Sequence, residues 1–288
     1  PVTEAVGYQA AASGIQTMNK RRGLYAAAAA ALVVCAAVPA LDSRLTVRRY
    51  AVQSEKLSAP VRLALLTDFH GCNYGRGQKE LLSALAEAAP DLVLLGGDIF
   101  DDHGDGAHTL ELIPLLAERW PCYYVTGNHE WWTMRAEEVK AWMERQGVTV
   151  LAGDCVQVQA GGQSLSLCGI DDPRAGEQRW TTQLEQAAGA RQEGFSLLLT
   201  HRPERIAAYL PCRFDLVLAG HAHGGQWRLL RLINGLYAPD QGLFPPYAGG
   251  LYHLKHTIFI VSRGLARETT RVPRIFNRPE LVVVDLLP

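Results

Sequence analysis

Five groups of polar residues occur along the chain, and each one directly follows a short apolar run. They contain carboxylates, imidazoles and one amide, all of which can bind metal ions. Mixed oxygen and imidazole ligands suit manganese, iron or zinc better than magnesium or calcium. These residue types therefore predict a site for two transition-metal ions. The groups are Asp68-Phe69-His70, Gly97-Asp98-Ile99-Phe100-Asp101, Gly127-Asn128-His129-Glu130, Thr200-His201 and Gly220-His221-Ala222-His223.

The spacing inside the groups allows ligands to converge. Two pairs are separated by one residue, so both side chains of a pair can face one edge: Asp68 with His70, and His221 with His223. The carboxylate of Asp98 can bridge two cations with its two oxygens, and Asn128 can offer its amide oxygen. Taken singly, each group is equally typical of a turn or a helix cap. Their joint occurrence after apolar runs favours a metal centre.

Strands are the elements that must position these groups. Short apolar runs predict strands at 61–66, 92–95, 122–125, 196–199 and 216–219, each ending at one of the groups. Amphipathic segments between them predict helices near 78–89, 109–119, 135–146, 180–190 and 204–209. Three strand-like pieces lie within 148–168, and two more at 257–261 and 281–286. Alternating strands and helices predict an α/β fold with much parallel pairing, built as two sheets with helices outside.

Composition sets further limits. The chain has 288 residues, 48% hydrophobic and 20% charged, which is enough for a large core. The net charge of −1 gives no indication of a nucleic-acid partner. None of the six cysteines forms a C-x-x-C pair, which excludes the usual structural zinc motifs. Cys122 and Cys168 lie in or beside apolar runs and are expected to be core thiols. The cysteine pattern predicts no particular disulfide pairing.

The N-terminal region predicts a membrane anchor. An uncharged run from Gly23 to Leu41 follows three basic residues and nearly reaches the roughly 20 residues that span a bilayer. We expect residues 1–17 to be a non-structural leader, 18–41 a signal-anchor or transmembrane helix, 42–59 a linker with an edge strand, and 60–288 the functional domain. The domain is expected outside the cytoplasm, because a short basic leading segment usually stays inside. Export after cleavage near Ala40 and a buried alanine-rich helix are the alternatives.

The ordered groups resemble the motifs of the calcineurin-like metallophosphoesterase superfamily over about residues 60–288. The tail resembles a membrane-associated bacterial branch that includes phosphodiesterases and enzymes of the UDP-2,3-diacylglucosamine pyrophosphatase type. Ala266 departs from that branch, in which a second glycine is commoner. The tail motifs are Gly220 to Gln226, Ser262-Arg263-Gly264-Leu265, and Arg274 to Glu280.

The resemblance implies a four-layer α-β-β-α sandwich of two mixed sheets flanked by helices, preceded by the N-terminal apolar helix. It implies that Asp68, His70 and His223 bind one metal ion, that Asn128, His201 and His221 bind the other, and that Asp98 bridges them. It places His129 beside the substrate phosphate, to stabilise the transition state or to protonate the leaving oxygen. Asp101 is a candidate to orient the ring of His129.

The implied activity is hydrolysis of a phosphodiester or pyrophosphate by a hydroxide that bridges the two ions, on a lipid or envelope precursor. A phosphomonoesterase or protein phosphatase on the same scaffold is one alternative. A membrane-tethered binding module without catalysis is another. The two cases of hydrolysis differ in whether the substrate is a diester or a monoester.

Several further residues have two interpretations. Arg263 and Arg274 are candidates for phosphate contact or for ion pairs. The pair Trp131-Trp132 is expected to pack in the core, with an apolar wall for the substrate as the alternative. The segment Phe244-Pro245-Pro246-Tyr247 is a candidate to cover the cleft. The remaining histidines are expected on the surface or in loops, with the last two also candidates to line the substrate mouth: His103, His108, His253 and His256.

Overall fold

The computed structural model describes Tyr25 and residues 37–104, 106–229, 233–267 and 272–288. The chain divides into two compact units, Pro1–Asp42 and Ser43–Pro288. In the first, the run expected to anchor the protein lies mostly outside the described residues, and 37–40 are helical. In the part of the chain that the structure describes, no helix has both the length and the apolar character needed to cross a bilayer. All that follows concerns the second unit.

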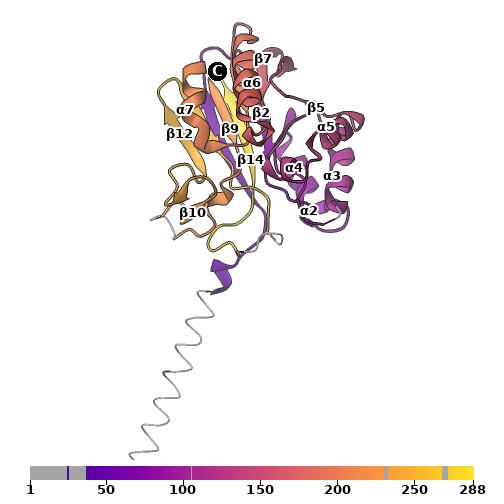
Figure 1. The fold of residues 1–288 in the computed structure, drawn as a ribbon, viewed down its shortest axis with the longest axis vertical. Helices are drawn as coiled ribbons and strands as arrows, with labels where there is room; N and C mark the ends of the chain where they lie inside the picture. Colours follow the sequence, from indigo (N-terminus) through magenta and orange to yellow (C-terminus); the bar gives the residue numbers. More distant parts are fainter. Residues whose placement is uncertain (1–24, 26–36, 105, 230–232, 268–271) are drawn as a thin grey trace, which may run out of the picture. The chain divides into compact units, whose positions relative to one another are not determined.

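The first of two six-stranded sheets is mixed and has the order β1-β14-β2-β3-β4-β5. Figure 1 shows the yellow strand β14 beside β2, with which it pairs. Strands β2 to β5 run parallel, β14 is antiparallel to β2, and β1 is parallel to β14 at the sheet edge. β14 therefore lies between two strands from the other end of the chain. The bounds are β1 Thr46–Gln53, β2 Val61–Leu66, β3 Leu92–Gly96, β4 Cys122–Val125, β5 Thr149–Val150 and β14 Glu280–Leu287.

The second six-stranded sheet has the order β12-β13-β9-β8-β7-β6, with parallel pairing from β13 to β7 and antiparallel strands at both edges. A small hairpin of β10 and β11 lies outside both sheets. The bounds are β6 Cys155–Ala160, β7 Gln163–Gly169, β8 Ser196–Leu199, β9 Leu216–Ala219, β10 Tyr237–Ala238, β11 Gly242–Leu243, β12 Gly250–Leu254 and β13 Thr257–Val261.

Helices cover the outer face of each sheet, as the apolar spacing predicts. In α2, Leu81, Leu85 and Ala88 recur on one face and are buried, and in α6 Trp180, Leu184 and Ala187 do the same. The bounds are α2 Lys79–Ala88, α3 Ala107–Ala117, α4 Asn128–Trp132, α5 Ala136–Arg145, α6 Glu177–Gly189 and α7 Ile206–Tyr209, with short 3₁₀ turns at Arg76–Gln78, Pro173–Ala175, Pro203–Arg205, Leu210–Cys212 and His223–Gly225.

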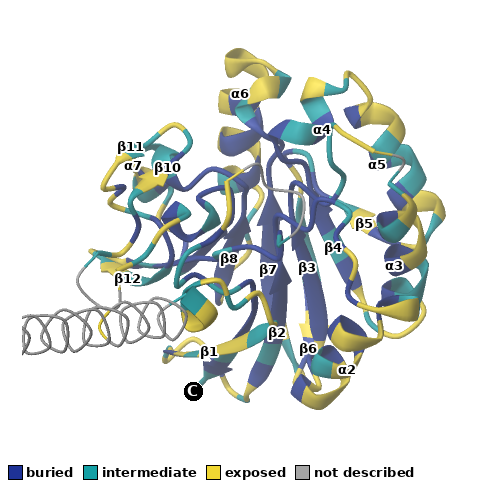
Figure 2. Cartoon of the chain, turned by 90° about the horizontal axis from the view of Figure 1, so that it is seen from below, coloured by how far each residue is buried: buried dark blue, intermediate teal, exposed yellow. Residues whose placement is uncertain are grey.

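The strands alternate their side chains between separate cores. In β2, Leu63 and Leu65 point into the core between the sheets, whereas Ala64 and Leu66 point towards helices α2, α3 and α5. β8 repeats this pattern, with Leu198 facing the third core under α6 and α7. Figure 2 shows the buried strands in dark blue between helices with exposed outer sides. The expected sandwich of two mixed sheets flanked by helices is confirmed.

The sequence pattern gave no sign of three elements. The hairpin β10–β11 and the antiparallel strand β12 fall in a stretch rich in glycine and proline, where loops were expected. In addition, residues 46–53 form eight ladder pairs with β14 and so belong to the first sheet along their whole length.

Candidate metal centre

All five polar groups lie just after the carboxyl ends of parallel strands. The first three follow β2, β3 and β4 of one sheet, and the other two follow β8 and β9 of the other sheet. Because the two sheets pack face to face, their loops meet at one rim. There the backbone N–H of His221 donates to both carboxylate oxygens of Asp68, at 2.9 and 3.2 Å, although 153 positions separate the two residues.

In these loops the backbone adopts a left-handed conformation, with positive φ, that residues other than glycine seldom adopt. The φ angles are +50° at Asp68, +49° at His70, +53° at Asp98, +65° at His221 and +46° at His223. Such residues are typical of sites where the surrounding structure enforces strain of about 1–3 kcal/mol each. Five candidate ligands therefore share a conformation that the fold has to stabilise.

Glycine permits the closest approach of two loops. A Cβ atom on Gly127 would lie 2.2 Å from Asp98 Oδ1, and one on Gly264 would lie 2.6 Å from the Cβ of Asp68. Neither distance is possible between real atoms, so only glycine fits. The glycine of the Gly127-Asn128-His129 motif thus places Asn128 beside Asp98.

Glu130 ties two of the loops together, and sequence reasoning did not assign it a role. Its buried carboxylate accepts the backbone N–H groups of Asp98 (3.1 Å), Ile99 (2.8 Å), Phe100 (3.1 Å) and Gly127 (2.8 Å). Burial, followed by the charge of Asp98, raises the pKa of Glu130 above its ordinary value. Its position three residues after Gly127, at the start of α4, is the signal that could have identified it as a capping carboxylate.

The expected ligands form two adjoining groups. Ligand atoms of Asp68, His70, Asp98 and His223 lie within 4.8 Å of one another, and so do those of Asp98, His201 and His221. Asp98 belongs to both groups, which is the position required of a bridging carboxylate. Asn128 lies next to them, because the following N–H, that of His129, donates to Asp98 Oδ1 at 2.9 Å. These clusters are consistent with a site for two metal ions.

The side chains fit metal ions because key atoms have no other partner. The buried atoms in this region that make no hydrogen bond include His70 Nε2, Asp98 Oδ2, Asn128 Oδ1 and His201 Nε2. Buried polar atoms are normally satisfied, at a cost of about 1–3 kcal/mol when they are not. All four carry lone pairs that a cation would satisfy together.

The tautomer of His201 supports the same conclusion. Its Nδ1 lies 2.8 Å from the carbonyl oxygen of Gly96, and that oxygen can only accept a hydrogen bond. The proton of the neutral ring therefore sits on Nδ1, and the lone pair of Nε2 faces Asp98 Oδ2 at 3.1 Å. Two acceptors at this distance repel unless a cation or proton lies beside both.

The charges in the site shift several pKa values. Burial alone would raise the pKa of Asp98, but the charge of a protonated His201 outweighs it and holds that pKa well below its ordinary value. Burial would lower the pKa of His201, but Asp98 raises it to about 10. Burial lowers the pKa of His223 to about 3, despite the opposing effect of Asp68. Asp98 is thus ionised and can bind a cation.

His129 lies beside the candidate ligands, and one of its ring nitrogens contacts two aspartate carboxylates. Its Nδ1 is 3.0 Å from Asp101 Oδ1 and 2.8 Å from Asp102 Oδ1, and its Nε2 is 3.9 Å from Asp98 Oδ2. Burial would lower the pKa of His129, but Asp101, Asp98 and Asp102 raise it to about 9. Asp101 therefore stands where an orienting partner was expected, and Asp102 is a second one that was not foreseen.

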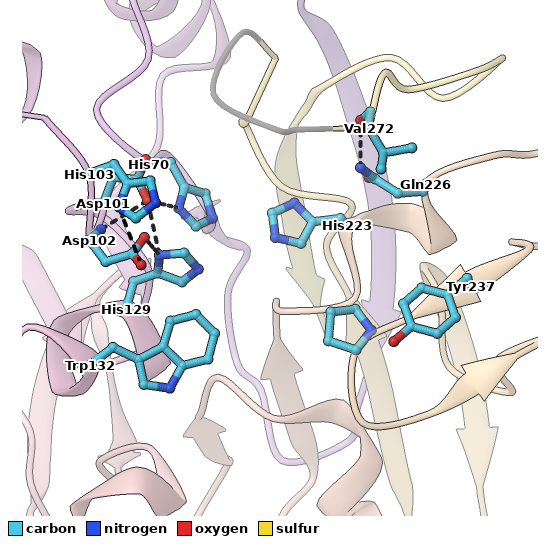
Figure 3. Close-up of a pocket in the computed structure, with 11 residues that line it drawn as sticks. His70, Asp101, Asp102, His103, His129, Trp132, His223, Gln226, Tyr237 and Val272 are labelled. Atoms are coloured by element: carbon cyan, nitrogen blue, oxygen red, sulfur yellow. Dashed lines mark hydrogen bonds and ion pairs between the residues drawn. The ribbon is translucent and has the colours of Figure 1, made fainter.

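A cavity of about 480 Å³ opens beside these groups. Figure 3 shows His70, His129 and Trp132 on one side and His223 and Tyr237 on the other. The wall is polar near the candidate ligands and apolar farther away. Its lining comprises His70, Asp101, Asp102, His103, His129, Trp132, His223, Gln226, Tyr237, Pro239 and Val272.

The aromatic expectations need correction. Trp132 is not a core residue, because its short helix α4 ends at the surface. It is 49% exposed and lines the cavity, and its ring centre lies 4.6 Å from that of His129, with the two rings tilted by 51°. Trp131 is half-buried and donates to Thr126 Oγ1 at 2.9 Å. The segment 244–247 does not line the cavity, since Tyr247 packs on Tyr252 and Phe259 in the outer core.

The two candidate phosphate contacts differ. Arg263 Nε lies 3.2 Å from Glu280 Oε2, so it forms an ion pair. Arg274 is buried, and its Nε and Nη1 atoms make no hydrogen bond, while burial lowers its pKa. Neither residue lines the cavity. Contact of Arg274 with substrate stays a prediction.

The other histidines mostly lie outside the site. His103 lines the cavity from an exposed loop. His253 and His256 are exposed and do not line it, which removes them from the substrate mouth.

One cysteine expectation is wrong. Cys168 is not a free core thiol but forms a disulfide with Cys155, the residue directly opposite it in the antiparallel pair β6–β7. Sequence reasoning missed the pair because cross-strand register depends on the turn at Gly161-Gly162. Cys122 is a buried free thiol, as expected, and burial raises its pKa to about 12.

The fold and the site together define an α/β sandwich with clustered Asp and His ligands at one rim. Comparison with known families agrees, because the model of the calcineurin-like phosphoesterases matches residues 61–225. The chain belongs to this family, whose members are metal-dependent phosphoesterases.

Individual relatives show the same family. A metallophosphoesterase of Helicobacter pylori is 30% identical over 257 residues, which cover 85% of this chain and 65% of that protein. The metallophosphoesterase YkuE of Bacillus subtilis is 30% identical over 72% of each chain. A transmembrane protein with a metallophosphoesterase domain from Bos taurus is 30% identical over 72% of this chain and 48% of that protein. The chain thus spans less than two thirds of the Helicobacter relative.

Proposed function

We propose that the protein is a phosphoric ester hydrolase that depends on two metal ions and cleaves a phosphodiester or pyrophosphate bond. The observation that carries this proposal is the set of four buried, unpaired ligand atoms beside an open cavity. We assign Asp68, His70 and His223 to one ion, Asn128, His201 and His221 to the other, and Asp98 to both. Bound metal ions would polarise the phosphoryl group and supply a water nucleophile at neutral pH.

In the proposed reaction His129 supplies a proton to the leaving group, and two acidic residues orient its ring. His129 directs Nδ1 to Asp101 and Asp102, which leaves Nε2 towards the ligands and the cavity. In the protonated form, Nε2–H can pass its proton to the leaving oxygen, and the ring becomes neutral. Before this transfer the two carboxylates stabilise the positive charge of the protonated ring and fix its orientation. General acid catalysis of this kind typically contributes about 10²–10⁴ in rate.

The apolar residues that line the cavity support a substrate with an apolar part, as in a lipid or envelope precursor of the kind acted on by the UDP-2,3-diacylglucosamine pyrophosphatase type. Trp132 lies on one side of the cavity, Tyr237 and Val272 lie on the other (Figure 3), and Pro239 also lines it. Tyr237 pairs across the hairpin with Leu243, which is 67% exposed, so apolar surface continues outward. Exposed apolar side chains grouped beside a polar site are typical of amphiphilic ligands.

Two assays test the reaction and the substrate class. Bis-p-nitrophenyl phosphate and p-nitrophenyl phosphate distinguish a diesterase from a monoesterase, and faster turnover of the monoester would overturn the diester assignment. Phosphorus release from a lipid extract then tests for an amphiphilic substrate. No release from the extract, by enzyme that turns over the diester, would refute the lipid proposal alone.

Two variants test the apolar wall. Trp132→Ala is expected to raise KM for a lipid-linked diester more than KM for bis-p-nitrophenyl phosphate. Met134→Ala is the control, since Met134 is 92% exposed, lies close in sequence and does not line the cavity. Equal effects of Trp132→Ala on both substrates would contradict a role in binding the apolar group.

We also propose that the domain is anchored to a membrane and faces an oxidising compartment. The uncharged run 23–41 supports the anchor, and the relative from Bos taurus is named as a transmembrane protein. The disulfide Cys155–Cys168 supports the compartment, because such bonds persist mainly outside the cytoplasm. Carbonate extraction of membranes, together with thiol alkylation before and after reduction, tests both. Recovery in the cytosol with both thiols alkylated before reduction would refute them.

A further inference from the structure

The turn of the β10–β11 hairpin reaches one of the candidate metal ligands. Asp240 lies between the two strands, has φ of +57°, and places Oδ2 at 3.0 Å from His221 Nε2. The same hairpin contributes Tyr237 and Pro239 to the cavity wall. This carboxylate contact joins the hairpin to the candidate metal centre.

A competing group lies at the same nitrogen. Arg202 Nη1 is 2.9 Å from His221 Nε2 and also contacts Asp240 Oδ2. Arg202 is buried and held in place by Asp172, which its Nε and Nη2 both contact. A guanidinium is always protonated and can only donate. His221 Nε2 therefore has one strict donor and one strict acceptor as neighbours.

These two neighbours favour opposite tautomers of His221. If Nε2 carries the proton, it donates to Asp240, and Nδ1 keeps a lone pair. If Nε2 carries the lone pair, it accepts from Arg202, and the proton moves to Nδ1. Only the first form leaves Nδ1 able to bind a metal ion, since a protonated ring nitrogen cannot be a ligand.

We propose that Asp240 is a positioning residue that selects the Nε2–H tautomer of His221 and so makes Nδ1 a metal ligand. This inference rests on the proposed two-metal site and deepens it. Asp240 also shares the charge of Arg202 with Asp172. Carboxylates that orient a ligating histidine in this manner typically change metal affinity by about 10–100-fold.

The same contacts argue against a separate cation at this place. Glu204, His221 and Asp240 lie close enough to hold a metal ion. However, Arg202 Nη1 lies 3.5 Å from Glu204 Oε1 and contacts the other two residues. The guanidinium already supplies the positive charge that these acids require. The role of Asp240 is therefore to orient His221, and Arg202 takes the place of a metal ion.

The experiment measures metal binding by the full chain, with manganese as the probe. Asp240→Ala is expected to weaken binding of one of two Mn²⁺ ions by roughly 10–100-fold, so that paired Mn²⁺ signals in electron paramagnetic resonance disappear at limiting metal. Asp240→Asn keeps an acceptor oxygen and is expected to lose less. Asp285→Ala is the control, because Asp285 pairs with Arg62 near the start of β2, at the end of the strand opposite the candidate ligands.

Nitrogen NMR of ¹⁵N-histidine-labelled, metal-free protein reads the tautomer directly. His221 is expected to be Nε2–H in the wild type and Nδ1–H in Asp240→Ala. An unchanged tautomer, or unchanged affinity for both ions in Asp240→Ala, would overturn the inference. If the wild type binds two ions and hydrolyses the diester, the proposed function survives that result. If the wild type binds none, the proposed function itself fails.

Discussion

The link made by Glu130 leads to a quantitative prediction for the variant Glu130→Gln. Each oxygen of Glu130 accepts two backbone N–H groups: Oε1 those of Ile99 and Phe100, and Oε2 those of Asp98 and Gly127. Glutamine keeps one oxygen and turns an NH₂ group towards the other two donors. Two of four buried hydrogen bonds to a charged group are lost, at about 1.5–3 kcal/mol each. We therefore expect a loss of about 3–6 kcal/mol in the free energy of unfolding.

Urea denaturation of the metal-free protein, followed by circular dichroism, measures this loss. Metal must be absent because a ligand that binds only the folded state adds its own stabilisation. With a slope of about 3 kcal/mol/M, the midpoint should fall by roughly 1–2 M. The loss is large against the total stability of about 5–15 kcal/mol that is common for proteins. Glutamine is therefore a better probe than alanine, because alanine would remove all four hydrogen bonds and an even larger part of that total stability.

Glu138→Gln is the matched control, since Glu138 lies on the neighbouring helix α5 with its side chain 70% exposed and pairs with Arg135. Exposed pairs of this kind contribute about 0–1 kcal/mol, so its midpoint should stay near that of the wild type. A Glu130→Gln midpoint equal to that of Glu138→Gln would refute the account of Glu130 as the tie between the two loops.

Three further perturbations have expected outcomes. Asp98→Ala should lose both metal binding and turnover, and elemental analysis that still finds two ions would contradict its bridging role. His129→Ala should keep both ions but lose about 10²–10⁴ in kcat, as steady-state kinetics can show, and an unchanged kcat would remove it as the acid. Reduction of the Cys155–Cys168 disulfide, which closes a 13-residue separation, should lower stability by about 2–4 kcal/mol in urea titrations while leaving metal content unchanged. Equal midpoints with and without reductant would count against the bond.

The sequence was sufficient to predict the buried parallel strands and to identify the candidate ligands. Apolar runs such as 61–66 and 216–219 are buried on both sides, and such strands carry a strong local signal that requires no knowledge of partners. The ligands were predictable for the same reason, because each follows such a run. Which sheet each run joins was not predictable in detail, since strand order depends on contacts between distant segments.

Residues that act through distant partners escaped prediction. Asp240 lies in a stretch where glycine and proline indicated only loops, and its role depends on a histidine 19 positions away on another element. Trp132 was expected in the core because it is a large aromatic residue next to Trp131, whereas its exposure depends on where α4 ends. Cys155 gave no signal, since its pairing depends on the register of one hairpin.

The position of β14 has a consequence for how the chain is made. This strand, residues 280–287, fills the gap between β1 and β2 in the first sheet. Until the ribosome has synthesised residue 287, β1 has no ladder partner in this sheet. During this time β2 can pair only with β3, and its other edge stays open. The first sheet therefore closes only once β14 has been translated, long after β1 and β2, and these early strands need protection from pairing with other molecules during that interval.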